Sequence, residues 1–176
     1  MIQLISVANS SNINPGLRPI YEEAFPPDER KEWDQWVELI SNLKFSLKEV
    51  YSDNKLIGFI SLWNLDEFWF IEHFAIAENE REKGFGSMVI KQIQMDNLTP
   101  TILEVEEPLT NSAIRRILFY KQLNFKFLNG SYYQPPYSIE KNKVKMLLMS
   151  YSNTIKKPTF KEVKIKIYQT VYNHSW

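Results

Sequence analysis

Two closely spaced glycines and a nearby arginine form the segment of this sequence best suited to binding an anion. Arg81, Gly84 and Gly86 lie in a loop between a predicted buried strand and a predicted helix that begins at Ser87. Such a loop presents unpaired backbone N–H groups and the positive end of a helix dipole to a ligand. We expect it to bind an anion, for which a pyrophosphate is the best match, although the glycines alone would also suit an ordinary tight turn.

Carboxylates on two predicted strands are candidates for proton transfer. On the strand that precedes the anion loop, the alternation of side chains places Glu72 and His73 on opposite faces, so that they cannot face the same pocket. On the strand predicted over residues 101–106, Glu104 and Glu106 share a face. Two such carboxylates could orient a water molecule or attract a cationic amine. Alternatively, one pairs with a neighbouring arginine and the other is solvated.

The composition excludes several function classes. The chain has 176 residues, and its 21 basic and 21 acidic side chains cancel, so no overall field attracts nucleic acid or an anionic membrane. The absence of cysteine excludes a disulfide framework, a thiolate metal site and a cysteine nucleophile. The sequence has no secretory signal, and no apolar run approaches the roughly 20 residues that span a bilayer. We therefore expect a cytoplasmic protein that binds neither nucleic acid nor membrane.

Hydrophobic periodicity predicts the elements that must position these residues. Runs rich in aromatic and β-branched residues predict strands, and apolar stripes at helical spacing predict helices. The expected strands are 2–7, 45–50, 56–63, 68–76, 101–106, 125–128 and 143–149, and the expected helices are 17–24, 29–43, 87–97 and 112–123. The fold class is therefore α/β (α+β), with a mixed, mostly antiparallel sheet of about six or seven strands flanked by helices.

The C-terminal residues predict one further helix. Thr159 and Glu162 have the spacing of a capping box, in which each side chain accepts a hydrogen bond from the backbone of the other. We expect a helix over about 159–173 that packs on the same domain. The chain is thus divided into a domain of residues 1–150 and an extension of residues 151–176. The lysines near this helix are expected on its solvated face: Lys156, Lys157, Lys161, Lys164 and Lys166.

Two motifs together resemble the GNAT superfamily of N-acetyltransferases. Arg81-x-x-Gly84-x-Gly86, directly after an apolar strand, is similar to the acetyl-coenzyme A signature of that family. Residues 103–106 resemble its next strand, and residues 115–125 resemble its following helix and strand, in which a tyrosine precedes a Gly-Phe pair. Asn124 stands at the glycine of that pair, which requires either a left-handed asparagine or another geometry. The resemblance implies a GNAT-like acetyltransferase domain.

The resemblance implies acetyl-coenzyme A as cosubstrate, with its pyrophosphate bound by the backbone amides of the loop. Glycine lets the backbone approach the phosphates closely, and the helix dipole favours them. The strand before the loop is expected to separate from the strand over 101–106, so that its backbone groups pair with the pantetheine amides. The residues expected to bind the cosubstrate are Phe74, Ala75, Ile76, Arg81, Glu82, Lys83, Gly84, Phe85, Gly86 and Ser87.

The resemblance also implies direct acetyl transfer to a primary amine in a ternary complex, with no metal and no covalent enzyme intermediate. Such a transfer needs a group that takes a proton from the amine and an acid for the leaving thiolate. Tyr120 matches the family's tyrosine that donates to the sulfur, although packing in the core would also explain it. Glu72 is the first candidate for the base and Glu104 is the second, and an ordinary salt bridge is the alternative role of each.

Aromatic and acidic residues are expected around the acceptor, which favours a small cationic amine over a protein substrate. Residues 25–30 are expected to close the acceptor pocket from one side, and a proline-rich loop over 130–138 from the other. The expected contacts are Phe25, Glu106, Tyr133, Gln134 and Tyr137. The alternative function is a non-catalytic acyl-coenzyme A-binding module or a regulatory GNAT-like protein. Such a protein would retain the loop but would not need Tyr120.

Overall fold

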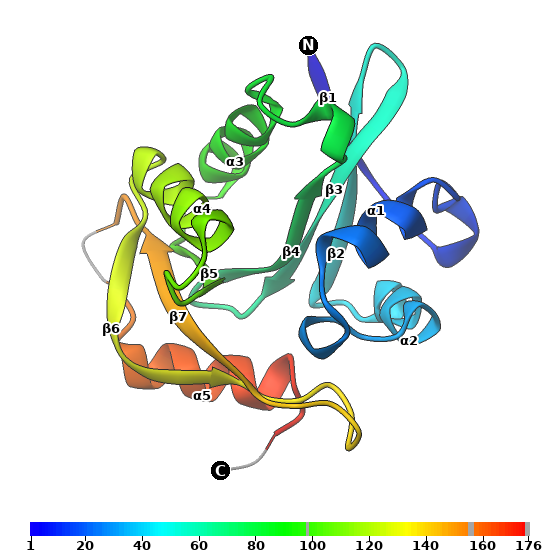
Figure 1. The fold of residues 1–176 in the computed structure, drawn as a ribbon. Helices are drawn as coiled ribbons and strands as arrows, with labels where there is room; N and C mark the ends of the chain where they lie inside the picture. Colours follow the sequence, from blue (N-terminus) through cyan, green and yellow to red (C-terminus); the bar gives the residue numbers. More distant parts are fainter. Residues whose placement is uncertain (98, 155–156, 175–176) are drawn as a thin grey trace.

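A seven-stranded mixed sheet organises the computed structural model, which describes residues 1–97, 99–154 and 157–174 (Figure 1). The strands are β1 (Ile2–Ser6), β2 (Phe45–Ser52), β3 (Lys55–Asn64), β4 (Trp69–Ile76), β5 (Thr101–Glu106), β6 (Lys126–Gln134) and β7 (Val144–Tyr151). Their order is β1-β2-β3-β4-β5-β7-β6, and every neighbouring pair is antiparallel except β4 and β5. The predicted mixed, mostly antiparallel sheet is confirmed.

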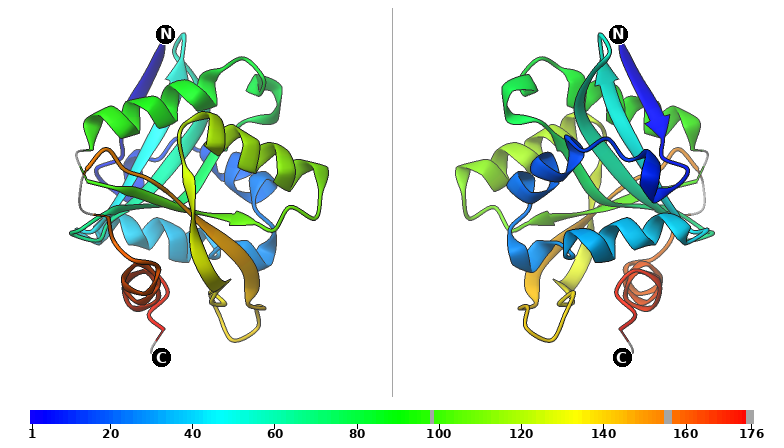
Figure 2. Two further views of the ribbon diagram at one scale, coloured as in Figure 1. Left: turned by 90° about the vertical axis from the view of Figure 1, so that its left-hand side faces the viewer. Right: turned by 90° about the vertical axis from the view of Figure 1, so that its right-hand side faces the viewer.

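Five α-helices cover the two faces of this sheet within the described ranges. They are α1 (Leu17–Ala24), α2 (Trp33–Glu38), α3 (Phe85–Asp96), α4 (Asn111–Gln122) and α5 (Phe160–Thr170). Short 3₁₀-helices are η1 (Ser10–Asn12), η2 (Pro27–Glu29), η3 (Leu39–Ser41) and η4 (Glu78–Glu80). Figure 2 shows α3 and α5 on opposite sides of the sheet. None of the helices in the described part of the chain is both long and apolar enough to cross a membrane.

The core consists of two hydrophobic clusters, one on each face of the sheet. Tyr21 of α1, Trp36 of α2 and Ile167 of α5 belong to the first cluster and are fully buried. Ile90 of α3 and Ile117 of α4 belong to the second. Because α5 shares a cluster with α1 and α2, the C-terminal helix is an integral part of the packed core.

The helix predicted over 29–43 is wrong, because only Trp33–Glu38 is α-helical. Arg30 has extended backbone angles, and so does Glu32 at the start of α2. The Lys141 ammonium group binds the Arg30 carbonyl oxygen at 2.6 Å and the Glu32 carboxylate at 2.7 Å. These contacts from a distant loop hold an extended conformation where local periodicity favours a helix.

The strand predicted over 125–128 is present but longer than expected, because β6 runs from Lys126 to Gln134. The pairing of β6 with β7 is irregular between Leu128 and Tyr132, so that part of the strand bulges. Gly130 lies in this bulge, and a Cβ atom there would be 2.4 Å from the ring of Phe160. The glycine thus allows α5 to pack against the bulged strand.

The C-terminal helix begins with the predicted capping box. The Glu162 backbone N–H donates to the Thr159 hydroxyl at 3.3 Å, and the Thr159 backbone N–H donates to the Glu162 carboxylate at 2.7 Å. Lys166, on the outer side of α5, pairs with Glu67 at 2.9 Å. Lys156 and the other residues of the predicted extension at 155 and 175–176 lie outside the described residues.

The two parallel strands separate as expected. β4 and β5 pair at three positions only, ending at Ile71 and Leu103. Beyond these residues, β4 runs on to Ile76 paired with β3 alone. One edge of β4 is therefore left without a neighbouring strand beside the loop that follows it.

Replacement of Gly58 by alanine is expected to destabilise the fold. A Cβ atom at Gly58 on β3 would lie 2.3 Å from the carbonyl oxygen of Ala75 on β4, which cannot move without disturbing the sheet. Gly58→Ala should therefore lower the free energy of unfolding by about 1–3 kcal/mol, measured by urea denaturation.

Gly16→Ala is the matched control. Its Cβ atom would lie 3.2 Å from the side-chain oxygen of Asn14, which can move more easily than a backbone atom. An equal loss of stability in both variants would show that the contact with the Ala75 carbonyl is not the cause.

Candidate functional site

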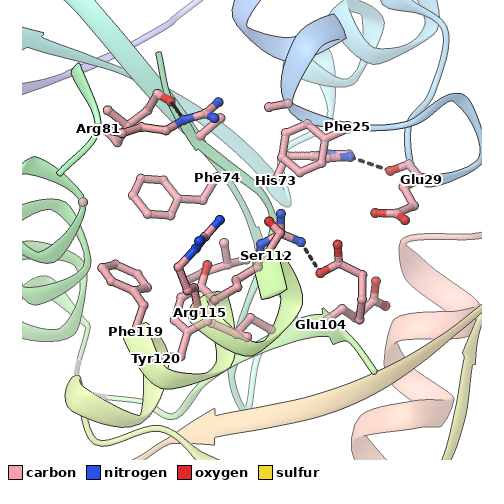
Figure 3. A pocket seen from close by; sticks show the side chains of 18 of the residues that line it. Phe25, Glu29, His73, Phe74, Arg81, Glu104, Ser112, Arg115, Phe119 and Tyr120 are labelled. Carbon is pink, nitrogen blue, oxygen red and sulfur yellow. Dashed lines mark hydrogen bonds and ion pairs between the residues drawn. The ribbon is translucent and has the colours of Figure 1, made fainter. Parts of the chain in front are cut away.

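A cavity of about 1190 Å³ lies where β4 and β5 separate, which is large for a small-molecule site. Figure 3 shows Arg81, Phe74 and Phe119 at one end and Glu29 and Glu104 at the other. The predicted residues that line it are Phe25, Glu72, Phe74, Ala75, Ile76, Arg81, Glu82, Gly84, Phe85, Gly86, Ser87, Glu104, Glu106, Tyr120 and Gln134. The lining does not include the predicted residues Lys83, Tyr133 and Tyr137.

The loop after β4 has the backbone geometry of an anion site. Gly84 precedes α3 with a φ of 83°, in the left-handed region that favours glycine. The helix begins at Phe85 instead of the predicted Ser87, and its first turn carries no side-chain cap. The first N–H groups of a helix have no partner within it, so those of α3 remain available to a ligand in the cavity.

The basic side chains of the loop mainly hold its shape. Arg81 donates from Nε to the Ile76 carbonyl oxygen at 2.9 Å, and its guanidinium lies 3.5 Å from the Glu23 carboxylate on α1. Lys83 pairs with Glu80 at 2.8 Å and is not among the residues that line the cavity. The backbone amides and the α3 dipole are therefore the main attraction for an anion here.

Glu72 and His73 line the same cavity, and the prediction that they face opposite sides is wrong. The pairing of β3 with β4 shifts between Ser61 and Leu62, where Ser61 pairs with His73 and Leu62 pairs with Ile71. Glu72 is the extra residue of this β-bulge. A bulge interrupts the alternation of side chains, so two consecutive residues can point the same way.

The Glu72 carboxylate is held by three donors and is only 1% exposed. It accepts hydrogen bonds from Trp63 at 2.8 Å and Tyr137 at 3.0 Å, and pairs with Lys31 at 3.4 Å. Burial raises the pKa of Glu72, but the Lys31 charge, that of His73 and these hydrogen bonds outweigh it and lower the pKa below its usual value. A carboxylate held in this way is a fixed anion and a weak base.

His73 is a buried histidine. Its Nε2 atom lies 3.1 Å from the Glu29 carbonyl oxygen, and its ring packs 4.6 Å from the Phe25 ring centroid. Burial lowers the pKa of His73, with Glu72 opposing this effect. Its Nδ1 atom has no hydrogen-bond partner within the described ranges. The imidazole is therefore neutral near pH 7.

Tyr120 lies on the inner side of α4 and is 6% exposed. Burial raises its pKa to about 12, the Arg116 charge opposes this effect, and the Glu106 charge adds to it. The phenol is thus protonated at neutral pH and available as a donor. Asn124, just beyond α4, adopts the left-handed conformation with a φ of 65°. This is one of the two geometries expected where the family has glycine.

Glu104 and Glu106 extend from β5 into the cavity with different partners. Glu106 pairs with Arg116 of α4. Glu104 accepts hydrogen bonds from the hydroxyl groups of Tyr132 and Tyr172. Burial raises the pKa of Glu104 to about 7, the two hydroxyls oppose this effect, and the nearby charge of Glu72 adds to it. Glu104 is therefore a titratable carboxylate near neutral pH.

Glu29 is a cavity residue that sequence reasoning missed. It lies in η2. Burial raises its pKa to about 7, and repulsion from the Glu106 charge adds to this effect. The expectation that residues 25–30 close the pocket was the only signal for it. No spacing or motif distinguishes Glu29 from the other glutamates of the N-terminal segment.

Two loops close the acidic end of the cavity. The Asp28 carboxylate accepts hydrogen bonds from the backbone and side chain of Asn142 at 3.0 and 3.1 Å. Gln134 donates to the Asp28 carbonyl oxygen at 3.1 Å. Tyr133 instead lies 36% exposed beneath the ammonium group of Lys143. Among the described residues, no group of three or more acidic or histidine side chains could hold a metal ion.

The carboxyl group of Glu29 is expected to make stability depend on pH. Its pKa rises from 4.5 to about 7 on folding, so its protonated form is favoured in the folded state. That stabilisation is present at low pH and is lost as the pH rises from 4.5 through about 7. Relative to Glu29→Gln, the wild type should lose about 1 kcal/mol between about pH 5 and about pH 8, in urea denaturation, after allowance for solvent contact.

Glu72→Gln is expected to change the pH dependence of stability in the opposite direction to Glu29→Gln. The folded pKa of Glu72 is lowered, so its contribution to stability is present above the usual carboxyl pKa and is lost as the pH falls. If both variants shifted the pH dependence in the same direction, the two pKa assignments would be contradicted.

Known proteins resemble this chain in sequence and in structure. A model of the acetyltransferase (GNAT) family matches residues 11–125. A GNAT-family protein from Bacteroides thetaiotaomicron is 30% identical, with a TM-score of 0.88 and 99% of each chain covered. A GNAT family acetyltransferase from Elizabethkingia anophelis with acetyl-CoA bound is 15% identical, with a TM-score of 0.62, and 86% of this chain and 97% of that chain are covered.

A further similar structure is Arabidopsis thaliana Naa50 in complex with the bisubstrate analogue CoA-Ac-MVNAL. It is 18% identical, with a TM-score of 0.63, and 86% of this chain and 98% of that chain are covered. No curated protein matches the sequence.

The family model spans well over half of the chain and includes the separated strands, the anion loop and Tyr120. The Bacteroides protein matches nearly all of the chain, including the region of α5. These matches agree with the fold of the mixed seven-stranded sheet. The chain therefore belongs to the acetyltransferase (GNAT) family.

Proposed function

We propose that this protein is an acetyl-coenzyme A-dependent N-acetyltransferase that transfers the acetyl group directly to a primary amine. One observation carries this proposal: the anion loop, the unpaired edge of β4, the Tyr120 phenol and the titratable carboxylates all line a single cavity. Their arrangement supports a ternary complex, in which both substrates are bound at once and no covalent enzyme intermediate is needed.

The cosubstrate is proposed to lie along β4 with its pyrophosphate over the start of α3. The free edge of β4 beyond Ile71 offers backbone groups to the amides of an extended ligand. Gly84 and Gly86 flank Phe85 at the start of α3, where the N–H groups favour phosphate oxygens. The acetyl-CoA bound to the similar Elizabethkingia structure supports this choice of ligand.

In the proposed reaction, the amine nitrogen attacks the thioester carbonyl carbon, a C–N bond forms and the C–S bond breaks. Glu104 takes a proton from the amine, because its pKa of about 7 suits a general base near neutral pH. The loss of this proton converts the ammonium group to the neutral nucleophile. Tyr120 gives its proton to the departing thiolate, and the second proton that the nitrogen loses as the amide forms restores the Tyr120 phenol. Glu72, the other candidate base, is proposed to remain ionised and to orient its neighbours, since Lys31 and Trp63 already occupy its oxygens.

The acceptor is proposed to be a small cationic amine. The acidic end of the cavity contains Glu29 and Glu104, neither of which forms an ion pair within the described ranges. A cationic amine would provide the missing charge. The hydrogen bonds between Asp28 and Asn142 tie the two loops at this end together, which restricts the space for a polypeptide.

Tyr120→Phe is expected to lower kcat for acetyl transfer about 100-fold or more, because the thiolate would lose its proton donor. The Kd of acetyl-coenzyme A should change by less than about threefold, since the hydroxyl acts only in the transition state. Thiol release with a panel of amines measures kcat, and calorimetry measures Kd.

Tyr151→Phe is the matched control, because Tyr151 packs against Phe125 outside the cavity. Unchanged turnover in Tyr120→Phe would contradict the role of its phenol. Wild-type protein that binds acetyl-coenzyme A and acetylates no amine of the panel would favour the non-catalytic alternative.

Gly84→Val is expected to weaken acetyl-coenzyme A binding about tenfold or more, because a β-branched residue is strained at a positive φ and the loop must change shape. Lys83→Ala should change the Kd by less than about threefold, since its ammonium group is paired with Glu80 and Lys83 does not line the cavity. Calorimetry with acetyl-coenzyme A measures the Kd of each variant. The reverse order of effects would show that side-chain charge dominates phosphate binding.

A further inference from the structure

Tyr172 reaches the cavity carboxylate from the C-terminal end of the chain. It follows α5 and lies outside residues 11–125, which match the family model. Its backbone N–H donates to the Ile167 carbonyl oxygen at 3.4 Å, and the preceding Val171 is 3% exposed. The packing of α5 against the sheet thus fixes the position of the Tyr172 ring.

Two phenol hydroxyls converge on Glu104. The Tyr172 hydroxyl lies 3.0 Å from Oε2 and 3.2 Å from Oε1 of Glu104. Tyr132, a buried residue of β6, donates to Oε1. No ion pair with Glu104 occurs in the described part of the chain. Neutral donors orient a carboxylate without supplying a full opposite charge, so Glu104 keeps the ability to take up a proton.

A row of hydroxyls connects Glu104 with Glu72. Tyr137 donates to Glu72 at 3.0 Å, and its oxygen lies 3.4 Å from that of Tyr172. Each phenol has one proton to donate, so Tyr137 serves Glu72 while Tyr172 serves Glu104. The two phenols therefore lie side by side, and each orients a different carboxylate.

We propose that Tyr172 and Tyr132 are positioning residues that hold Glu104 as the base of the acetyl transfer. They act through Glu104 and do not themselves exchange protons with the substrate. This inference rests on the proposed N-acetyltransferase function. It assigns the segment after α5 a direct part in the chemistry of the cavity.

The positioning role has a signature in the dependence of activity on pH. The groups that face Glu104 from the surrounding elements are Tyr132, Tyr137, Tyr168, Tyr172, Glu29 and Glu72. Hydrogen bonds from Tyr132 and Tyr172 lower the pKa of Glu104 against the effect of burial. Removal of one hydroxyl should therefore raise that pKa, and the base would become ionised only at higher pH.

Tyr172→Phe is expected to shift the acidic limb of the kcat/KM profile upward by about one pH unit, since a hydrogen bond to a charged group has about this strength. Below the limb, kcat/KM should fall about tenfold, and well above it the value should stay within about twofold of the wild type. The assay follows thiol release with the best amine acceptor over the full pH range.

Tyr168→Phe is the matched control from the adjoining helix α5, because its hydroxyl donates to the Tyr133 carbonyl oxygen. The acidic limb of the kcat/KM profile of this variant should stay at the wild-type pH. Tyr132→Phe is a second variant that should shift the limb in the same direction as Tyr172→Phe, in case the latter does not fold.

Two results would overturn the inference in distinguishable ways. If the wild type transfers acetyl groups but neither variant at Tyr132 or Tyr172 moves the limb, or if activity falls equally at every pH, the positioning role fails alone. If the wild type acetylates no amine, the proposed function and this inference fail together.

Discussion

The separation of β4 from β5 is the constraint on which the rest of the site depends. The two strands run parallel and pair only as far as Ile71 and Leu103. Beyond this point, the free edge of β4 needs hydrogen-bond partners from something other than the sheet. The anion loop follows directly after the same strand, so a ligand that pairs with β4 also reaches the start of α3. An extended ligand with amides and phosphates meets both requirements.

Charge divides the cavity into two ends with different chemistry (Figure 3). The start of α3 attracts an anion at one end, whereas Glu29 and Glu104 favour a cation at the other. The carboxylates near this acidic end also differ from each other. Lys31 keeps Glu72 ionised, while burial raises the pKa of Glu104 to about 7. Because their environments move the two pKa values apart, Glu72 is suited to anchor its neighbours and Glu104 is suited to accept a proton.

Local sequence patterns are sufficient to predict those parts of the site that are formed by residues close together in the chain. The anion loop was predicted in this way, because a strand, a loop and a helix follow one another in the chain, and Tyr120 was predicted from its resemblance to a family motif. The face of Glu72 was not predictable, since it depends on a register shift of β4 against β3. Alternation within one strand carries no information about such a bulge. Glu29 and Tyr172 were missed because segments distant in sequence bring them to the cavity.

The C-terminal helix connects the stability of this fold with the chemistry of its cavity. A carboxylate whose pKa is raised by burial costs folding free energy whenever it is ionised, and other contacts must offset this cost. Val163 and Ile167 of α5 are fully buried and contribute apolar area of the kind that does so. The same helix places Tyr172 within hydrogen-bond distance of Glu104. A segment that stabilises the core therefore also determines how readily the cavity carboxylate can ionise.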